Sequence, residues 1–182
     1  MMPTDADLLA LLDRLETVTA DSLEGQHLDF KPWTGAKEDL KVAVEYAVAF
    51  ANAQGGAVVF GVADKVQGRS AAIHGCGPCD LDLWRRSICD ATRPQVVAQI
   101  SELAVPEGTG LLVVMRVDRG IDPPYGTSQG LYKVRVGKNN LPLDPAEARA
   151  WRAQIGELSD RPIRAVIFTA SDRMNAESLA AM

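Results

Sequence analysis

Cysteine and histidine side chains gather in one short segment of the sequence. Cys76 and Cys79 are separated by a Gly-Pro pair, His74 lies two residues before the first of them, and Cys89 lies ten residues after the second. Two cysteines at this spacing ahead of a helix are typical of redox-active dithiols, in which the helix start lowers the pKa of a thiol. The same four side chains would also supply the ligands of a tetrahedral zinc site. Free thiols in a reducing compartment are the third interpretation and the one we favour, with zinc the weaker alternative.

A second segment is basic. The run Lys133-Val-Arg135-Val predicts a strand with Lys133 and Arg135 on one face, and Lys138 and Asn139 follow in the next loop. Residues 131–143 contain no aspartate or glutamate. This pattern favours a nucleic-acid contact made through phosphates rather than base edges. A solvated edge strand that uses lysine and arginine to avoid aggregation explains it equally well.

The elements that must position these side chains follow from hydrophobic periodicity. Alternation over residues 27–31 predicts a strand with Asp29 and Lys31 on one face. A helical pattern over 36–53, stopped by paired glycines, leads into a buried strand at 57–62. The remaining expected elements are helices at 4–17, from 81 to about 93 and from 145 onward, and strands at 96–103, 111–117 and 131–136. This order predicts an α+β fold with a mixed, largely antiparallel sheet covered by helices.

Length and composition suit one ordinary domain. The chain has 182 residues, of which 47% are hydrophobic, so it can bury a sizeable core. We expect a domain over residues 1–160 and an extension over 161–182, with one more strand at 163–169. No apolar run approaches the roughly 20 residues that cross a bilayer, and the N-terminus does not resemble a secretory signal. We therefore expect a cytoplasmic protein with no membrane partner.

The charge balance limits the classes of function. A net charge of −5 counts against strong non-specific coating of DNA, although it leaves room for a local basic patch. The sequence contains neither a GxxxxGK phosphate loop nor a GxGxxG dinucleotide fingerprint. Its two histidines, His27 and His74, belong to no recognisable catalytic triad.

Three ordered segments resemble the Schlafen AlbA-like family. The first runs from Glu24 to Lys31 and is similar to an acid-x4-acid-Phe-Lys opening. The second runs from Ala49 to Asp64 and resembles the pattern AFAN-x-x-GG, a strand, and GV-x-D. The third comprises residues 123–125 and 132–137, which are similar to P-x-Y followed by Y-x-R-x-G. Together they span about residues 20–155, most of the chain.

The resemblance implies a compact module associated with nucleic acids. Some members of the family cleave transfer RNA with three carboxylates that bind a divalent metal, and Glu24, Asp29 and Asp64 match those positions. Mg²⁺ or Mn²⁺ held by such oxygens orients a water and polarises a phosphate, and Lys31 would hold the scissile phosphate. The family usually has glutamate where this chain has Asp29, which shortens the reach by one methylene group.

Three hypotheses follow, and they leave open whether the protein is an enzyme. The first is a module that binds DNA or RNA in regulation, including transcriptional regulation, or in defence, without catalysis of its own. The second is a metal-dependent endoribonuclease that uses the three carboxylates. The third is a protein-interaction module whose ancestral site has decayed. A homodimer is a further expectation.

Overall fold

The computed structural model describes residues 2–150. It divides into two compact units, Met1–Pro142 and Leu143–Met182. In the second unit a helix begins after Asp144, whose Oδ1 accepts hydrogen bonds from the backbone N–H groups of Ala146 (2.8 Å) and Glu147 (3.4 Å). The predicted helix start is therefore confirmed. The predicted domain boundary at residue 160 and the strand at 163–169 lie outside the described residues.

The first unit contains all the named helices and strands. The helices are α1 (Asp5–Asp13), the 3-10 turn η1 (Arg14–Glu16), α2 (Ala20–Leu23), α3 (Ala36–Ala51), α4 (Arg69–Ala72) and α5 (Leu81–Asp90). The strands are β1 (Leu28–Lys31), β2 (Gly56–Phe60), β3 (Thr92–Arg93), β4 (Ala98–Ala104), β5 (Leu111–Val117), β6 (Gly126–Thr127), β7 (Lys133–Val136) and β8 (Asn139–Pro142).

A four-stranded sheet in the order β1-β2-β5-β4 forms the centre of this unit. Strands β1 and β2 are parallel, because α3 crosses between them, whereas β2–β5 and β5–β4 are antiparallel. Two smaller ribbons accompany the sheet: β3 pairs with β6, and β7 pairs with β8 as a hairpin. The predicted fold class, a mixed and largely antiparallel sheet with helices, is confirmed.

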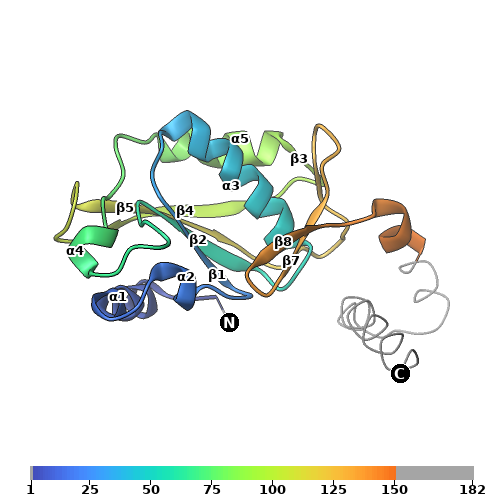
Figure 1. Ribbon diagram of the computed structural model, residues 1–182. Helices are drawn as coiled ribbons and strands as arrows, with labels where there is room; N and C mark the ends of the chain where they lie inside the picture. Colours follow the sequence, from blue (N-terminus) through green and yellow to red (C-terminus); the bar gives the residue numbers. More distant parts are fainter. Residues whose placement is uncertain (1, 151–182) are drawn as a thin grey trace, which may run out of the picture. The chain divides into compact units, whose positions relative to one another are not determined.

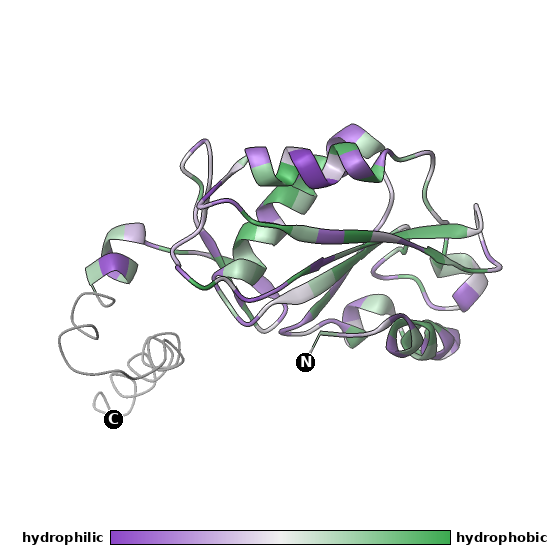
Figure 2. Cartoon of the chain, turned by 180° about the vertical axis from the view of Figure 1, so that it is seen from behind, coloured by the Kyte–Doolittle hydropathy of each residue, from purple (hydrophilic) through white to green (hydrophobic). Residues whose placement is uncertain are grey.

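Helices cover both faces of the sheet (Figure 1). Helices α3 and α5 lie on one face, and α1, α2 and α4 lie on the other. All five residues of β2 are buried, as expected for a central strand covered on both sides. Figure 2 shows the sheet largely in the green of apolar residues, between helices that carry purple on their outer surfaces.

The connection between α3 and β2 fixes the position of the hairpin. Gly55 adopts φ +76°, which allows the tight reversal after α3 that the paired glycines predict. Asn52, at the end of α3, donates its Nδ2 to the carbonyls of Tyr125 and Lys133, both at 2.8 Å. Its Oδ1 accepts from the Tyr125 N–H at 2.7 Å. One buried amide therefore joins the end of α3 to the start of β7.

The structure differs from the predicted elements only in short segments. The expected helix at 4–17 is divided into α1 and η1, and the elements α2, α4, β3 and β6, of two to four residues each, have no counterpart in the prediction. The loop expected after Val136 is a tight turn, because Gly137 at φ +58° reverses the chain and Asn139 starts β8. Over residues 2–150, none of the helices is long and apolar enough to cross a membrane.

Candidate functional site

Strand β1 carries the charged residues of the opening motif into the interior. Leu28 and Phe30 pack on the face covered by α1, so Asp29 and Lys31 point to the opposite face, where α3 lies. Asp29 is only 1% exposed, and its Oδ1 forms an ion pair with the Lys31 ammonium but accepts no hydrogen bond of regular geometry. Burial lowers the pKa of Lys31, but the bond to Asp29 outweighs it and the pKa is raised.

Arg135 reaches the same carboxylate from β7. Its Nη1 lies 2.8 Å from Asp29 Oδ2 and donates to Asn140 Oδ1 at 3.2 Å. Its Nε and Nη2 donate to the Gly25 carbonyl at 3.2 and 2.9 Å, and Nη2 also donates to the Leu28 carbonyl at 3.1 Å. The side chain is fully buried. Contrary to the prediction, Arg135 is not available to contact a phosphate, because its donors are all engaged inside the unit.

Tyr46 of α3 completes this group of charges. Its hydroxyl donates to Asp29 Oδ2 at 3.1 Å. The Lys31 ammonium lies 5.3 Å from the centre of the ring and the Arg135 guanidinium 5.7 Å, both within the range of cation–π attraction. Burial and the nearby Asp29 charge raise the pKa of the Tyr46 hydroxyl, so it is held as a hydrogen-bond donor. We call Asp29, Lys31, Tyr46 and Arg135 the Asp29 cluster.

Glu24 lies beside this cluster. It follows the last residue of α2, and its Oε1 accepts a hydrogen bond from the Phe30 N–H at 3.1 Å. Burial raises the pKa of Glu24 from 4.5 to about 7, with a further contribution from the charge of Asp29. Glu24 can therefore exchange a proton near neutral pH, which neither a fully exposed nor a firmly ion-paired carboxylate does.

The third predicted carboxylate, Asp64, lies in the turn after β2. Its backbone carbonyl accepts from the Asp21 N–H at 2.8 Å, which ties that turn to α2. The charges of Asp29 and Asp21 both contribute to the raised pKa of Glu24. Within residues 2–150, no three histidine, cysteine, aspartate or glutamate side chains gather as a metal site would require.

A divalent metal does not fit the carboxylates as they are arranged. Such an ion needs several oxygen ligands free of other partners. Both oxygens of Asp29 already face cations, Lys31 at Oδ1 and Arg135 at Oδ2. The structure thus brings Glu24 and Asp29 together, but it neutralises Asp29 with cationic side chains of the same chain.

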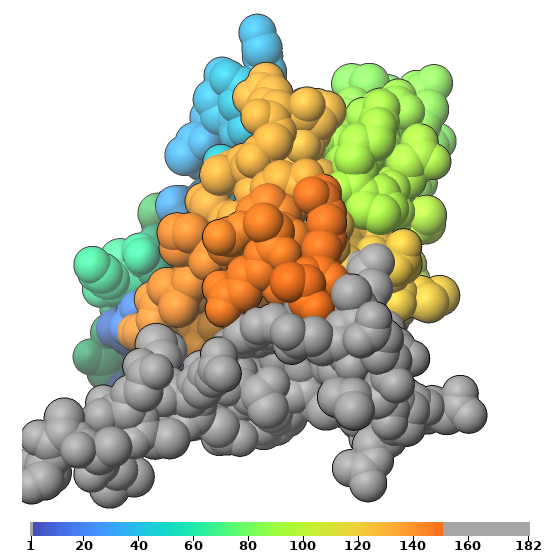
Figure 3. All heavy atoms as spheres, turned by 90° about the vertical axis from the view of Figure 1, so that its right-hand side faces the viewer, coloured from blue at the N-terminus to red at the C-terminus, as the bar shows by residue number. Residues whose placement is uncertain are grey.

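The β7–β8 hairpin presents the basic residues that stay at the surface. Lys138, in the turn, is 48% exposed and pairs with Asp21 at 2.9 and 3.0 Å, while Asn139 beside it is exposed. Lys133 pairs with Glu45 of α3 at 2.6 Å. Figure 3 shows the orange residues of this hairpin at the surface, beside the gold residues of the loop that precedes them. Lys138 and Asn139 are therefore the most accessible of the predicted nucleic-acid contacts.

Gln26 holds this hairpin in place from the side of β1. Its Nε2 donates to the Arg135 carbonyl and its Oε1 accepts from the Gly137 N–H, both at 2.8 Å. Together with Arg135 and Asn52, it fixes the hairpin at three points. The hairpin turn thus presents Lys138 from a rigid support.

The cysteine segment contains three free thiols, two of which are held protonated by burial. Cys76 is buried, its Sγ donates to the Phe60 carbonyl at 3.1 Å, and burial raises the pKa of its thiol to about 12. Burial also raises the pKa of Cys79 to about 11. Cys89 is a free thiol like the other two, and His74 Nε2 lies 2.8 Å from the Ala71 carbonyl. Thiols held protonated are poor nucleophiles, which counts against a redox-active dithiol, whereas the zinc site stays a prediction.

Sequence reasoning missed several residues that shape these surfaces. Tyr46 interrupts an apolar stretch of α3 at a position whose hydroxyl needs a buried partner, and that requirement is a signal for Asp29. Asp21 and Glu45, the partners of Lys138 and Lys133, are more than 80 residues away in the sequence and carry no local signal.

Comparison with known proteins identifies the class. The model of the family described as "Schlafen, AlbA_2" matches residues 24–144, and the chain belongs to this family. The predicted family is confirmed. A search of curated proteins finds no match.

The chain is similar to two solved structures, and the first of them shows the same fold. The DIP2311 protein from Corynebacterium diphtheriae is 22% identical with a TM-score of 0.56, and the match covers 71% of this chain. The chain spans about a quarter, 27%, of that protein. The N-terminal domain of a protein from Nitrosomonas europaea, described as related to the ATP-dependent DNA helicase RecG, is 20% identical with a TM-score of 0.45, and the match covers 79% of this chain and 95% of that domain.

Proposed function

We propose that this protein is a nucleic-acid-binding module that contacts phosphates through the turn of the β7–β8 hairpin. The observation that carries the proposal is a rigidly held turn with an exposed lysine, Lys138, followed by an exposed asparagine, Asn139. Membership of the Schlafen AlbA_2 family supports it, because the family resemblance implies nucleic-acid association. The module would act in regulation or defence on DNA or RNA.

The ion pairs at the hairpin do not block this role. An exposed pair such as Lys138–Asp21 contributes little to stability, so a phosphate can replace the aspartate at small cost. Lys133 is less accessible, with 26% of its side chain exposed. Arg135 serves the surface indirectly, because it anchors β7 to β1. The contact surface is small, which agrees with the acidic net charge of −5 and implies modest affinity.

The test is a salt series. Binding of fluorescent DNA and RNA oligonucleotides is measured by anisotropy for the wild type, Lys138→Gln and the control Lys37→Gln. Lys37 is an exposed lysine in the first turn of α3, at the end of that helix away from the hairpin (Figure 1). Loss of one phosphate contact lowers the salt slope by about 1, and we expect this for Lys138→Gln alone. Absence of salt-dependent binding, or equal effects of the two variants, would contradict the proposal.

The second candidate is the metal-dependent endoribonuclease with Glu24, Asp29 and Asp64. The observation in its favour is the proximity of two of these acids, seen in the raised pKa of Glu24. The opposing observation is the pairing of Asp29 with Lys31 and Arg135. Incubation of the protein with transfer RNA and Mn²⁺, beside Asp64→Ala, tests it: no cleavage, or equal cleavage by the variant, removes this candidate. If neither binding nor cleavage is seen, the protein-interaction module becomes the preferred function.

A further inference from the structure

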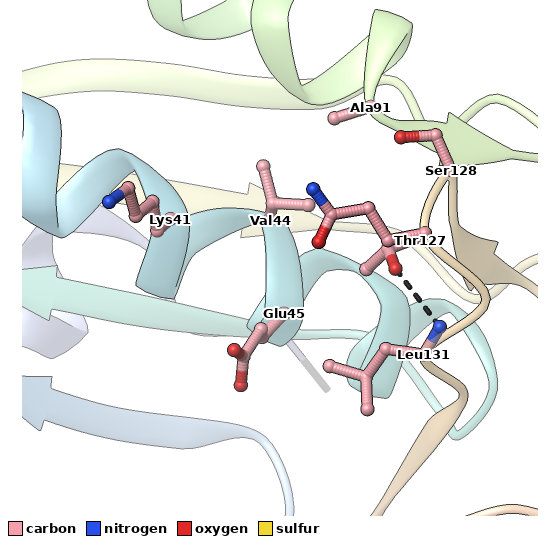
Figure 4. A pocket seen from close by; sticks show the side chains of 8 residues that line it. Lys41, Val44, Glu45, Ala91, Thr127, Ser128 and Leu131 are labelled. Carbon is pink, nitrogen blue, oxygen red and sulfur yellow. Dashed lines mark hydrogen bonds between the residues drawn. The ribbon is translucent and has the colours of Figure 1, made fainter.

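A pocket of about 410 Å³ lies between the middle of α3, the end of α5 and the loop from β6 to β7. It is separate from the Asp29 cluster and from the hairpin turn. Its lining combines a lysine, a carboxylate, two hydroxyls, an amide and three apolar side chains: Lys41, Glu45, Thr127, Ser128, Gln129, Val44, Ala91 and Leu131. Figure 4 shows Val44 of α3 directed toward the loop that carries Thr127, Ser128 and Leu131, whereas the long side chains of Lys41 and Glu45, on the same helix, extend away from that loop. The volume lies within the range of small-molecule sites.

The walls of the pocket are held in position by the backbone. Thr127 and Leu131 close the loop with two hydrogen bonds, from the Thr127 N–H to the Leu131 carbonyl at 2.8 Å and from the Leu131 N–H to Thr127 Oγ1 at 3.1 Å. The Ser128 N–H donates to the Ala91 carbonyl at 2.7 Å, which ties the loop to the end of α5. The β3–β6 ribbon adds backbone pairing at Thr127. A ligand would therefore meet a preformed surface and would order little of it on binding.

The charges of the lining favour an anion. Glu45 is neutralised by its ion pair with Lys133 at 2.6 Å. The side chain of Lys41 is exposed and forms no ion pair or hydrogen bond with any residue from 2 to 150. The pocket and this ion pair together thus carry one net positive charge, on a side chain whose three donors are unused.

The uncharged groups favour a ligand with a flat apolar body and polar edges. Val44 and Leu131 supply apolar surface, and Leu131 is 40% exposed. The side chains of Ser128 and Gln129 have no hydrogen-bond partner within the described part of the chain, so a hydroxyl and an amide remain free to bind a ligand. A glutamine amide both donates and accepts, which is the pattern that pairs with the edge of a nucleobase.

From this combination we infer that the pocket binds one nucleotide unit. Its phosphate pairs with Lys41, its base lies against Val44 and Leu131, and the edge of the base is hydrogen-bonded by Gln129 and Ser128. The unit comes either from a free nucleotide or from a single strand, because the bases of a duplex are stacked and paired and cannot enter a pocket. The inference does not depend on the hairpin, since a free nucleotide would need no contact with Lys138.

The test uses calorimetric titration of the full chain. The probes are the four ribonucleoside 5′-monophosphates, inorganic phosphate, and single-stranded oligonucleotides of about 12 nucleotides. The variants are Lys41→Gln and Gln129→Ala, with Lys37→Gln as the matched control, because it removes the same charge one turn earlier on the same helix. All these side chains are exposed, and equal melting temperatures verify that each variant is folded.

We expect at least one monophosphate, or a single strand, to bind more tightly than inorganic phosphate. Lys41→Gln and Gln129→Ala should each weaken that binding about tenfold, the usual effect of losing one hydrogen bond to a charged group or to a base edge, and Lys37→Gln should not. Equal affinities for monophosphate and strand identify a free nucleotide as the source. A strand that binds at least tenfold more tightly identifies a nucleic acid.

Three results would overturn the inference: no response to any nucleotide or strand, equal losses in Lys41→Gln and Lys37→Gln, or inorganic phosphate that binds as tightly as the nucleotides. Lys138→Gln separates this site from the hairpin. Monophosphate binding that is unchanged in this variant supports an independent pocket, even where the hairpin proposal fails. A loss in Lys138→Gln as large as in Lys41→Gln would count against a distinct site.

Discussion

Replacement of Arg135 by methionine should destabilise the protein strongly, although the position lies in a short surface hairpin. The substitution removes one of two cations from the buried Asp29 and removes the guanidinium hydrogen bonds to the carbonyls of Gly25 and Leu28. Breaking a buried ion pair by removing one partner costs about 3–5 kcal/mol. Because Lys31 still pairs with Asp29, we take the low end of this range, about 3 kcal/mol, for the loss of the ion pair. The loss of the hydrogen bonds to the two carbonyls adds about 1 kcal/mol. We expect a total of about 4 kcal/mol.

Lys133→Met provides the matched control. Lys133 lies on the same strand, two residues away, and also forms an ion pair, but both side chains of that pair are partly exposed. Such pairs contribute less than about 1 kcal/mol. Urea unfolding followed by circular dichroism measures both variants, and the difference should also appear as a melting temperature about 10 °C lower for Arg135→Met.

The competing explanation makes the opposite prediction. If Arg135 were a phosphate contact, Arg135→Met would weaken nucleic-acid binding and leave the free energy of unfolding near that of the wild type. That outcome, or an equal stability loss in Arg135→Met and Lys133→Met, would refute the burial argument.

Three further predictions concern single side chains. Because the folded pKa of Glu24, about 7, lies above its unfolded value of 4.5, its contribution to stability is complete below pH 4.5 and is lost as the pH rises through 7. Glu24→Gln should therefore flatten the stability profile between pH 5 and 8; an unchanged profile in urea titrations would contradict the assignment. Cys76, whose pKa is about 12, should react with a thiol reagent at pH 7.5 only after the protein is unfolded in guanidinium. Mass spectrometry maps the labelled cysteine, and rapid labelling of Cys76 in the native protein would argue against its burial. Asp39→Ala removes a buried carboxylate that accepts three hydrogen bonds from the residues just before α3, and it should lower the free energy of unfolding by about 2 kcal/mol. Glu38→Ala, at an exposed position beside it, is the control and should cost much less. Equal losses in chemical unfolding would show that these hydrogen bonds contribute little.

The centre of the fold could be predicted from the sequence because its signals are local. Alternation marks β1, and the apolar second half of α3 with its paired glycines marks the passage into β2. Helices α2 and α4, of four residues each, carry no such signal, because they are too short to show a periodicity and their bounds depend on contacts such as that between Gly68 N–H and the Leu15 carbonyl.

The candidate site was harder to predict, and Arg135 shows why. Alternation correctly placed it on the face of β7 opposite Val134 and Val136, but alternation does not tell whether that face meets water or another strand. Its neighbour there, Asp29, is more than 100 residues away in the sequence. The sequence alone does not tell whether a basic residue in a strand, such as Arg135, or a single acid in an apolar strand, such as Asp29, is buried or exposed. Only the fold brings the two side chains together.

The arginines at the borders of the central sheet also bear on how the protein avoids self-association. Strands β1 and β4 are the outermost strands and would offer open backbone groups to another chain. On β1 the Leu28 carbonyl is occupied by the Arg135 guanidinium, and on β4 the Ile100 carbonyl accepts from Arg85 of α5. A charged, bulky side chain at each border leaves an incoming strand fewer acceptors and obstructs its approach. The same contacts that fix the hairpin and α5 therefore also protect the sheet against extension by a second molecule.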